Sequence, residues 1–282
     1  MKRNSKKPDG TNLSLKIFTY AFLGIVVFMS LFPFYLMFVS ATLSNNEILS
    51  ESPRMIFGAN LMQNIQNLNE RIDIVKVLFN SIFITLTYTA LSLILHSMAG
   101  YALAKFEFKG KTIIFGIILA TLMIPFQVLL IPLFKMMNGI GWQNTYQAVI
   151  IPALANAFGI FLMRQNMLSF PNSLIEAARI DGCGELSIFF KIVLPTMKPA
   201  IGALGIYNFM AQWGNFMWPL IILSTKDKYT LPVALAALEG LQRKDYGMIM
   251  LGSTIATIPI MIIFLIFQRQ FVSGMLGGSV KG

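Results

Sequence analysis

Few side chains in this sequence could take part in covalent or metal chemistry. It contains one histidine, His96, and one cysteine, Cys183, and neither belongs to a cluster with the spacing of metal ligands. A single cysteine cannot form an intramolecular disulfide. We therefore expect no metal site, no histidine-based catalytic triad and no enzymatic activity in this chain.

The tripeptide Gly110-Lys111-Thr112 imitates the end of a phosphate-binding loop. The complete motif needs a glycine five positions before Gly110, but Lys105 occupies that position. A long apolar stretch also begins at Thr112. We therefore expect no nucleotide site here, so an ATP-driven process would need a separate ATPase subunit.

The segment between residues 173 and 195 carries a more specific pattern. Ser173 and Glu176 match an S-x-x-E capping box, which predicts a helix start. Leu174, Ala177 and Ala178 then share one helix face. Asp181-Gly182 predicts a turn at the helix end, because glycine adopts a positive φ without strain.

A second amphipathic stretch follows this turn and ends at Pro195. Its apolar stripe consists of Leu186, Phe189, Phe190 and Val193. The segment is therefore predicted to form two short helices at a sharp angle. From the residues alone, the first helix could dock on a partner or pack on its own protein.

Two further groups of polar residues could bind a ligand. The first lies in one apolar stretch and comprises Asn208, Gln212, Asn215 and Trp218, whose amides and indole suit sugar hydroxyls and sugar faces. Packing against a partner, with Trp218 at the membrane interface, is the alternative. The second group lies in a polar loop and comprises Lys226, Asp227, Lys228 and Tyr229. A solvated connector is the alternative there.

The elements that position these residues are predicted to be membrane spans. Of 282 residues, 56% are hydrophobic and only 12% charged, about half the charge of a soluble domain. Six stretches are long enough to cross a bilayer, which needs about 20 residues. They are roughly 17–42, 81–104, 112–134, 146–163, 199–223 and 247–267. None contains Asp, Glu, Lys or Arg, so His96 has no ionisable partner for a proton relay, and we expect it to be a neutral, hydrogen-bonded group.

The basic residues predict the orientation of these spans. The net charge is +10, which in so apolar a chain indicates cytoplasmic loops rather than nucleic-acid binding. With the N-terminus inside, fourteen of the 22 Lys and Arg residues fall in cytoplasmic segments. Both termini are then cytoplasmic, and the 173–195 segment lies on the cytoplasmic face.

A family resemblance adds to this interpretation. The 176–195 segment resembles the EAA loop of ABC-importer permeases at every anchor position. These positions are Glu176-Ala177-Ala178, then Gly182 after three residues, Ile192 after nine more, and Leu194-Pro195 after one more. Tyr101–Phe106, Phe158–Gln165 and Asn215–Leu220 are similar to the carbohydrate-uptake branch that includes MalG-like subunits, the binding-protein-dependent transport inner membrane components. The similarity covers about residues 80–282.

The resemblance implies an all-α membrane protein with six transmembrane helices, the type I ABC importer permease fold. Hydropathy and charge divide the first part of the chain into a cytoplasmic N-terminal segment (1–16) and a first span with an extracytoplasmic loop (17–79), and the resemblance covers the permease core (80–271) and a C-terminal tail (272–282). It also implies a multi-pass protein of the prokaryotic cytoplasmic (inner) membrane.

The resemblance also implies partners and site residues. The ATPase-coupling residues would be Glu176, Ala177, Ala178, Asp181, Gly182, Ile192, Leu194 and Pro195, and the loop 226–229 would contact a binding protein. The expected partners are a homologous second permease subunit, two cytoplasmic ABC ATPase subunits, an extracytoplasmic solute-binding protein and the lipid bilayer, with no nucleic acid. This chain would hold no cofactor, since ATP and Mg²⁺ would bind the ATPase subunits.

The sequence thus predicts a permease subunit of an ATP-driven, binding-protein-dependent importer for sugars, oligosaccharides in particular. An importer of a glycerol-phosphate-like polyol or another small solute is the alternative within the family. A proton-coupled secondary transporter and a non-transporting scaffold are the alternatives outside it.

Overall fold

The computed structural model describes residues 13–52, 54–240 and 244–276. The expectations for residues 1–12 and for the end of the tail, 277–282, lie outside this range. The described residues contain helices and no strand, which confirms the all-α prediction. Three helices are long and apolar enough to cross a membrane: α1 (Leu13–Ser40), α4 (Ile74–Lys105) and the Tyr246–Gln268 part of α15 (Tyr246–Leu276).

Three bent helix pairs among the described residues bring the number of candidate spans to six when each pair counts as one span. The first joins α5 (Lys111–Ala120) and η1 (Thr121–Met123) to α6 (Phe126–Gly139) at 103°. The second joins α7 (Tyr146–Ile150) and η2 (Ile151–Ala153) to α8 (Ala157–Leu168) at 45°. The third joins α10 (Glu185–Ile188), η3 (Phe189–Val193) and α11 (Leu194–Thr196) to α12 (Lys198–Trp213) at 84°.

The first two breaks correct the continuous spans expected over 112–134 and 146–163, and the span expected over 199–223 is interrupted after Trp213. Proline explains the first break, because the residue before a proline is driven out of the α conformation. Ile124, before Pro125, is extended with φ −90° and ψ 115°. The third expected span stops at Trp213 and resumes only as α13 (Met217–Ile222).

The chain divides into two compact units, and the larger comprises Leu68–Gln242 and Ile255–Gly282. In it, α8 and α12 pack against the long helix α4. Gly100 permits the close approach to α8, since a Cβ at this position would lie 2.8 Å from Met163 Cβ and from Arg164 N. Asn208 of α12 donates to Ser92 Oγ of α4 at 2.8 Å.

His96 of α4 is fully buried at the break between η2 and α8. Its Nε2 lies 2.9 Å from the carbonyl oxygen of Leu154 and 3.3 Å from the backbone nitrogen of Asn156. Gly159 leaves room for the ring, because a Cβ there would overlap it. Because one ring nitrogen either donates or accepts, the histidine satisfies one of these two backbone groups at the break, as expected of a hydrogen-bonded group inside a bundle.

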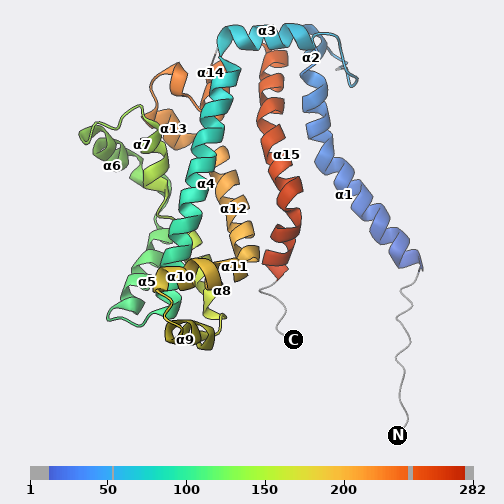
Figure 1. Cartoon of the computed structure of the whole chain (residues 1–282). Coiled ribbons are helices and arrows are strands. Elements are labelled where there is room, and N and C mark those ends of the chain that lie inside the picture. The colour runs from blue at the N-terminus through green and yellow to red at the C-terminus, as the bar shows by residue number, and fades with distance from the viewer. Residues whose placement is uncertain (1–12, 53, 241–243, 277–282) are drawn as a thin grey trace. The chain divides into compact units, whose positions relative to one another are not determined.

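Short helices gather at the two ends of α4 (Figure 1). Those near its first residues are α13 and α14 (Leu231–Glu239), and those near its last residues are α5, α9 (Asn172–Ile180) and α10. Both groups belong to the larger unit. The two sets of candidate residues, 176–195 and 226–229, therefore lie at opposite ends of one helix.

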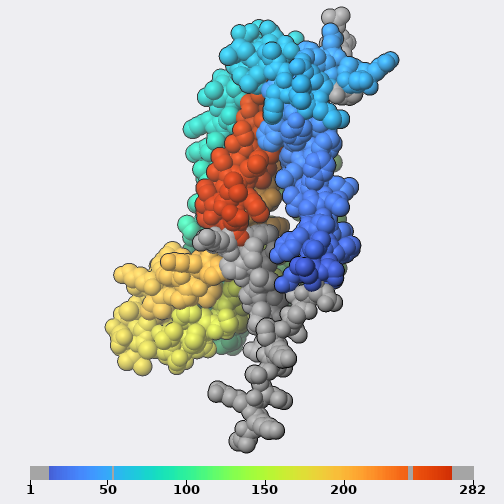
Figure 2. Space-filling view, turned by 90° about the vertical axis from the view of Figure 1, so that its right-hand side faces the viewer, coloured from blue at the N-terminus to red at the C-terminus, as the bar shows by residue number. Residues whose placement is uncertain are grey.

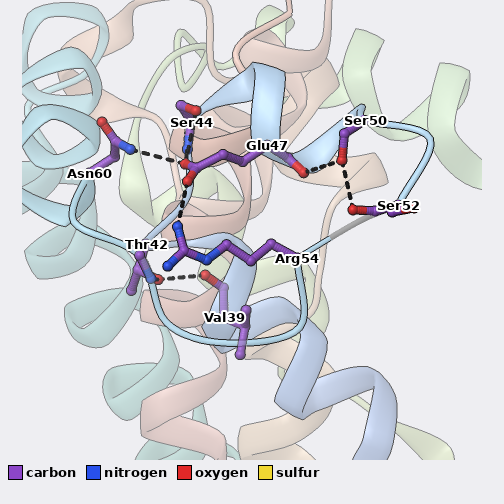
Figure 3. A network of polar contacts seen from close by, with 9 residues as sticks. Val39, Thr42, Ser44, Glu47, Ser50, Ser52, Arg54 and Asn60 are labelled. Atoms are coloured by element: carbon purple, nitrogen blue, oxygen red, sulfur yellow. Dashed lines mark hydrogen bonds and ion pairs between the residues drawn. The ribbon is translucent and has the colours of Figure 1, made fainter.

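The smaller unit comprises Met1–Asn67 and Arg243–Thr254. Its helix α1 buries only Val39, as suits a helix facing lipid or a partner chain. The following loop, with α2 (Asn45–Ile48), is organised by Glu47 (Figure 3). The Glu47 carboxylate accepts hydrogen bonds from Ser44, Arg54 and Asn60 at 2.8–3.1 Å. These contacts fold the loop over the end of α1, and α3 (Leu61–Arg71) begins directly after it.

Candidate functional site

The first helix of the predicted site, α9, begins two residues earlier than the capping box in the sequence suggested. Pro171 is its N-cap, and no side chain makes a capping hydrogen bond. Pro171 is extended, with φ −65° and ψ 126°, and the helix starts at the next residue, Asn172. Ser173 lies within the first turn, and the predicted capping box of Ser173 and Glu176 is wrong.

The end of α9 matches the sequence prediction. Gly182 has φ +79°, and Cys183 N donates to Ala178 O at 2.9 Å while Gly182 N donates to Arg179 O at 3.0 Å. This pair of bonds is a Schellman motif, which needs a left-handed residue after the helix. A Cβ on Gly182 would meet no other atom, so only the backbone conformation requires glycine here.

One face of α9 is buried and the other is exposed. Ile175 and Ala178 pack against Ile188, Phe189 and Met163 in a core cluster. Glu176 and Ala177 are exposed, as are Asp181 and Gly182 at the turn. Leu174, predicted to share a face with Ala178, is 51% exposed. The helix therefore presents Leu174, Glu176 and Ala177 outward, and Figure 2 shows this part of the chain, in yellow to gold, on the surface.

The stretch after the turn is helical but irregular. A π-helical turn, η3, separates α10 from α11 and shifts the periodicity by one residue. Ile188, Phe189 and Val193 are buried, with Ile192 and Leu194 packed beside them. The single stripe predicted through Leu186 and Phe190 is wrong, since both are exposed. Pro195 lies in α11, just before the 84° bend into α12.

Polar contacts tie the glycine turn to the end of α4. Arg179 Nε lies 2.6 Å from Glu185 Oε1 across the turn. Tyr101 of α4 donates to Glu185 Oε2 at 3.4 Å. The Arg179 guanidinium also lies 5.9 Å from the ring centre of Phe106. The hydrogen bond with Glu185 raises the pKa of Arg179, which therefore stays charged. The two arms of the segment are thus held to each other and to α4.

Lys105, the last residue of α4, holds the other side of α9. Its Nζ donates to Phe170 O at 2.6 Å and to Asn172 Oδ1 at 2.9 Å, and lies 3.4 Å from Leu168 O. An ammonium group pairs well with the unsatisfied carbonyls at a helix end. The connection from α8 into α9 is therefore fixed on α4.

Sequence reasoning did not identify Tyr101, Lys105, Arg179 or Glu185 as part of this site. The oppositely charged pair 179 and 185, six residues apart across a predicted turn, was a signal that could have been used. The contacts of Tyr101 and Lys105 join residues more than 60 positions apart. Local patterns carry no information about such contacts.

The four residues proposed for a substrate pathway fall into two environments. Asn208 is fully buried on Ser92, and Trp218 is 1% exposed with Nε1 donating to Ala148 O at 2.8 Å. Neither lines the cavity that the other two border. Gln212 and Asn215 both line a cavity of about 690 Å³, together with Tyr88 and Asn156. Asn215 Nδ2 lies 3.3 Å from Gln212 Oε1.

The predicted outer loop is firmly attached to its surroundings. Asn80 Nδ2 donates to Asp227 O and Tyr229 O, both at 3.0 Å, and Lys228 Nζ donates to Asn144 O at 2.7 Å. A hydrogen bond from Thr225, with nearby Lys76 and Lys228, lowers the pKa of Asp227. Lys226 and Asp227 are exposed. The loop is thus a fixed surface rather than a loose connector.

Comparison with known proteins identifies the family. A family model for the binding-protein-dependent transport system inner membrane component matches residues 96–276. The chain belongs to this family. It is an inner membrane permease component of a transport system, and the EAA pattern of 176–195 is typical of such chains.

Individual relatives of the permease chain cover most of its length. The lactose transport system permease protein LacG of Rhizobium radiobacter is 39% identical over 265 residues, 94% of this chain and 96% of that protein. The arabinooligosaccharides transport system permease protein AraQ of Bacillus subtilis is 44% identical over 207 residues, 73% of this chain and 74% of that protein.

A solved structure supports the fold of the permease chain. A chain of a bacterial ABC transporter involved in import of the acidic polysaccharide alginate matches with a TM-score of 0.80 and 23% identity. The match covers 95% of this chain and 100% of that chain. The importer permease fold predicted from the sequence is therefore confirmed.

Proposed function

We propose that this chain forms half of the pathway of an ATP-driven, binding-protein-dependent importer for sugars, oligosaccharides in particular. The relatives named for lactose and arabinooligosaccharides support a sugar substrate. The observation that carries the coupling role is the geometry of α9. Its outward face is exposed, while its inward face and both ends are fixed to α4.

The coupling residues transmit force and carry out no chemistry. In this proposal, α9 seats Glu176 and Ala177 in a cleft of a cytoplasmic ATPase subunit, and Asp181 and Gly182 shape the turn behind them. Ile192, Leu194 and Pro195 carry the displacement toward the bend before α12. Because α9 and α4 are joined by Tyr101, Lys105 and the core cluster, a push on α9 moves α4 with it.

The remaining parts complete an alternating-access cycle. A homologous second permease pairs with this chain, and two ATPase subunits bind ATP and Mg²⁺. Their closure draws the coupling helices together and rocks the two halves between inward- and outward-facing states. The exposed residues Lys226 and Asp227 contact the solute-binding protein on the outer face. Both chain termini are cytoplasmic, in agreement with the basic residues at both ends of the sequence.

Two glycines of the turn provide the test. Gly182→Val forces a β-branched residue into the left-handed region, where the strain is about 1–3 kcal/mol. We expect the complex to assemble and hydrolyse ATP, but with uptake no longer coupled to hydrolysis. Gly184→Val is the matched control, because Gly184 has φ −71° and ψ 154° and open space around it.

The measurement is sugar uptake per ATP hydrolysed in vesicles that contain the complete transporter. Wild-type coupling in the Gly182→Val transporter would contradict the coupling role of this turn. Loss of coupling in the Gly184→Val control would show that bulk, not backbone conformation, is what the turn cannot tolerate.

A further inference from the structure

The cavity of about 690 Å³ is bordered by the breaks of the first two bent helix pairs and by the end of α12. Its lining includes Leu122 and Ile124 at the first break, Ala155 and Asn156 at the second, and Gln212 and Asn215 where α12 ends. Irregular backbone at membrane depth is tolerated only inside protein or along a cavity. The volume is in the range of sites for small molecules.

Gln212 lines this cavity and has a buried donor that is not used. It is 6% exposed, and its Nε2 has no hydrogen-bond partner among the described residues. Its Oε1 is engaged by Asn215 Nδ2 at 3.3 Å. This contact orients the glutamine amide. A buried N–H without a partner is unfavourable, so a hydroxyl or carbonyl of a bound solute would be its natural acceptor.

The remaining walls determine which solutes suit this donor. The described residues that line the cavity include no Lys, Arg, His, Asp or Glu. Most are apolar, such as Leu129, Leu133 and Met136. An anion in such a site would lose its hydration without gaining a positive partner. A neutral molecule with hydroxyl groups and apolar C–H faces would lose little hydration free energy on entering this site.

We propose that Gln212 and Asn215 contact the transported solute directly and select neutral, polyhydroxylated molecules over anionic ones. This inference rests on the importer function proposed above. It narrows that function to neutral oligosaccharides and disfavours a phosphorylated polyol. Asn208 and Trp218 act only in packing, since they are buried away from the cavity.

The experiment measures solute import by the complete transporter, purified and reconstituted in vesicles with its binding protein. The probes are a labelled neutral trisaccharide, a labelled oligosaccharide of uronic acids, and labelled glycerol 3-phosphate. Wild type should import the neutral sugar and neither anion. Gln212→Leu should lower kcat/KM for sugar import about fivefold to thirtyfold, as the loss of one buried hydrogen bond predicts. ATP hydrolysis stimulated by the binding protein should persist.

Two more variants separate a solute contact from a folding defect. Asn215→Ala removes the partner of the glutamine amide at a half-buried position and should lower import about threefold to tenfold. Gln147→Leu is the matched control, because Gln147 is exposed on α7 and does not line the cavity. It should import within about twofold of wild type.

The outcomes distinguish the two proposals. Import of the neutral sugar at the wild-type rate by both Gln212→Leu and Asn215→Ala would overturn the solute contact and leave the importer function standing. Preferential import of either anion would overturn the selection of neutral solutes. No ATP-driven import of any probe would contradict the sugar importer function itself, and the cavity proposal with it.

Discussion

Individual residues at the cytoplasmic end of α4 differ in how much they contribute to holding α9. Ile175 is 3% exposed in the core cluster, whereas the Arg179–Glu185 pair has 42% of each side chain exposed. Exposed ion pairs are screened by water and salt, but a buried isoleucine cannot be shortened without leaving a cavity. Burial of Ile175 should therefore hold α9 in its position, and the Arg179–Glu185 ion pair should determine only the angle of the turn.

This difference gives a stability prediction. Ile175→Ala should lower the free energy of unfolding by about 2–4 kcal/mol. Arg179→Ala should lower it by much less, and that loss should disappear at high salt. Denaturant unfolding of the purified chain in detergent measures both. A loss for Arg179→Ala equal to that for Ile175→Ala would contradict the assignment.

Glu47 predicts a pH dependence of the loop after α1. Its hydrogen bonds with Ser44, followed by the one from Arg54, lower the pKa of Glu47 below its ordinary value of 4.5. A carboxyl whose pKa is lowered by folding stabilises the fold above pH 4.5, and that contribution is lost as the pH falls through the lowered value. Hydrogen-exchange protection of residues 44–60 should therefore fall in acid.

The matched variant is Glu47→Gln, which keeps the shape of the side chain. Its loop should be less protected at neutral pH, with a weaker pH dependence than wild type. A wild-type loop whose protection stays constant from pH 7 to well below pH 4 would show that the Glu47 network does not hold it.

Residue-level features were predictable where their cause is local. Asp181-Gly182 indicated the turn because only a left-handed residue ends a helix in this way, and Gly182 has φ +79°. The start of α9 was missed because the helix begins directly after Pro171, which places Ser173 within the first turn instead of at the N-cap. The contact of Lys105 with Phe170 O spans 65 residues, so no local pattern could reveal it.

At the scale of elements, the close packing of α4 on α8 depends on Gly100. A Cβ there would lie 2.8 Å from a backbone nitrogen of α8, which cannot move without shifting the helix. Gly100→Ala should therefore destabilise the chain by about 1–3 kcal/mol. Denaturant unfolding in detergent provides the measurement.

Gly205 of α12 is the control for this prediction. A Cβ there would lie 3.5 Å from Leu93 Cδ1, which is ordinary contact. Gly205→Ala should be neutral or stabilise by up to about 1 kcal/mol, because alanine favours helix. Equal effects of the two substitutions would mean that helix propensity, not the approach of α4 and α8, dominates at Gly100.

The apolar stretches were predicted from the sequence, but the form of the helices in them was not. Hydropathy over about 20 residues detects an apolar stretch whether or not the helix is continuous. It therefore indicated 112–134 as one span, although α5 and α6 meet at 103°. Pro125 is visible in the sequence, but a proline can also be accommodated within a continuous span, as Pro33 is in α1. The sequence therefore shows the proline but not which of these two outcomes it produces.

For the whole molecule, the orientation in the membrane can be tested with the single native cysteine. Cys183 is exposed at the glycine turn, on the side predicted to be cytoplasmic. A membrane-impermeant thiol reagent should label it in inside-out vesicles that hold this chain without ATPase subunits, and not in right-side-out vesicles. A Cys183→Ser, Lys226→Cys variant should give the reverse pattern. Labelling of Cys183 in right-side-out vesicles would show that the topology is the opposite of the one predicted.

ATP-dependent accumulation of a labelled neutral oligosaccharide in vesicles tests the central claim most directly. The vesicles would contain the complex purified through a tag on this chain, with ATP supplied on the ATPase side and the binding protein on the opposite side. We predict accumulation that requires both ATP and the binding protein and is unaffected by collapse of the proton gradient. Accumulation that follows the proton gradient and continues without ATP would contradict the importer account and favour a proton-coupled transporter.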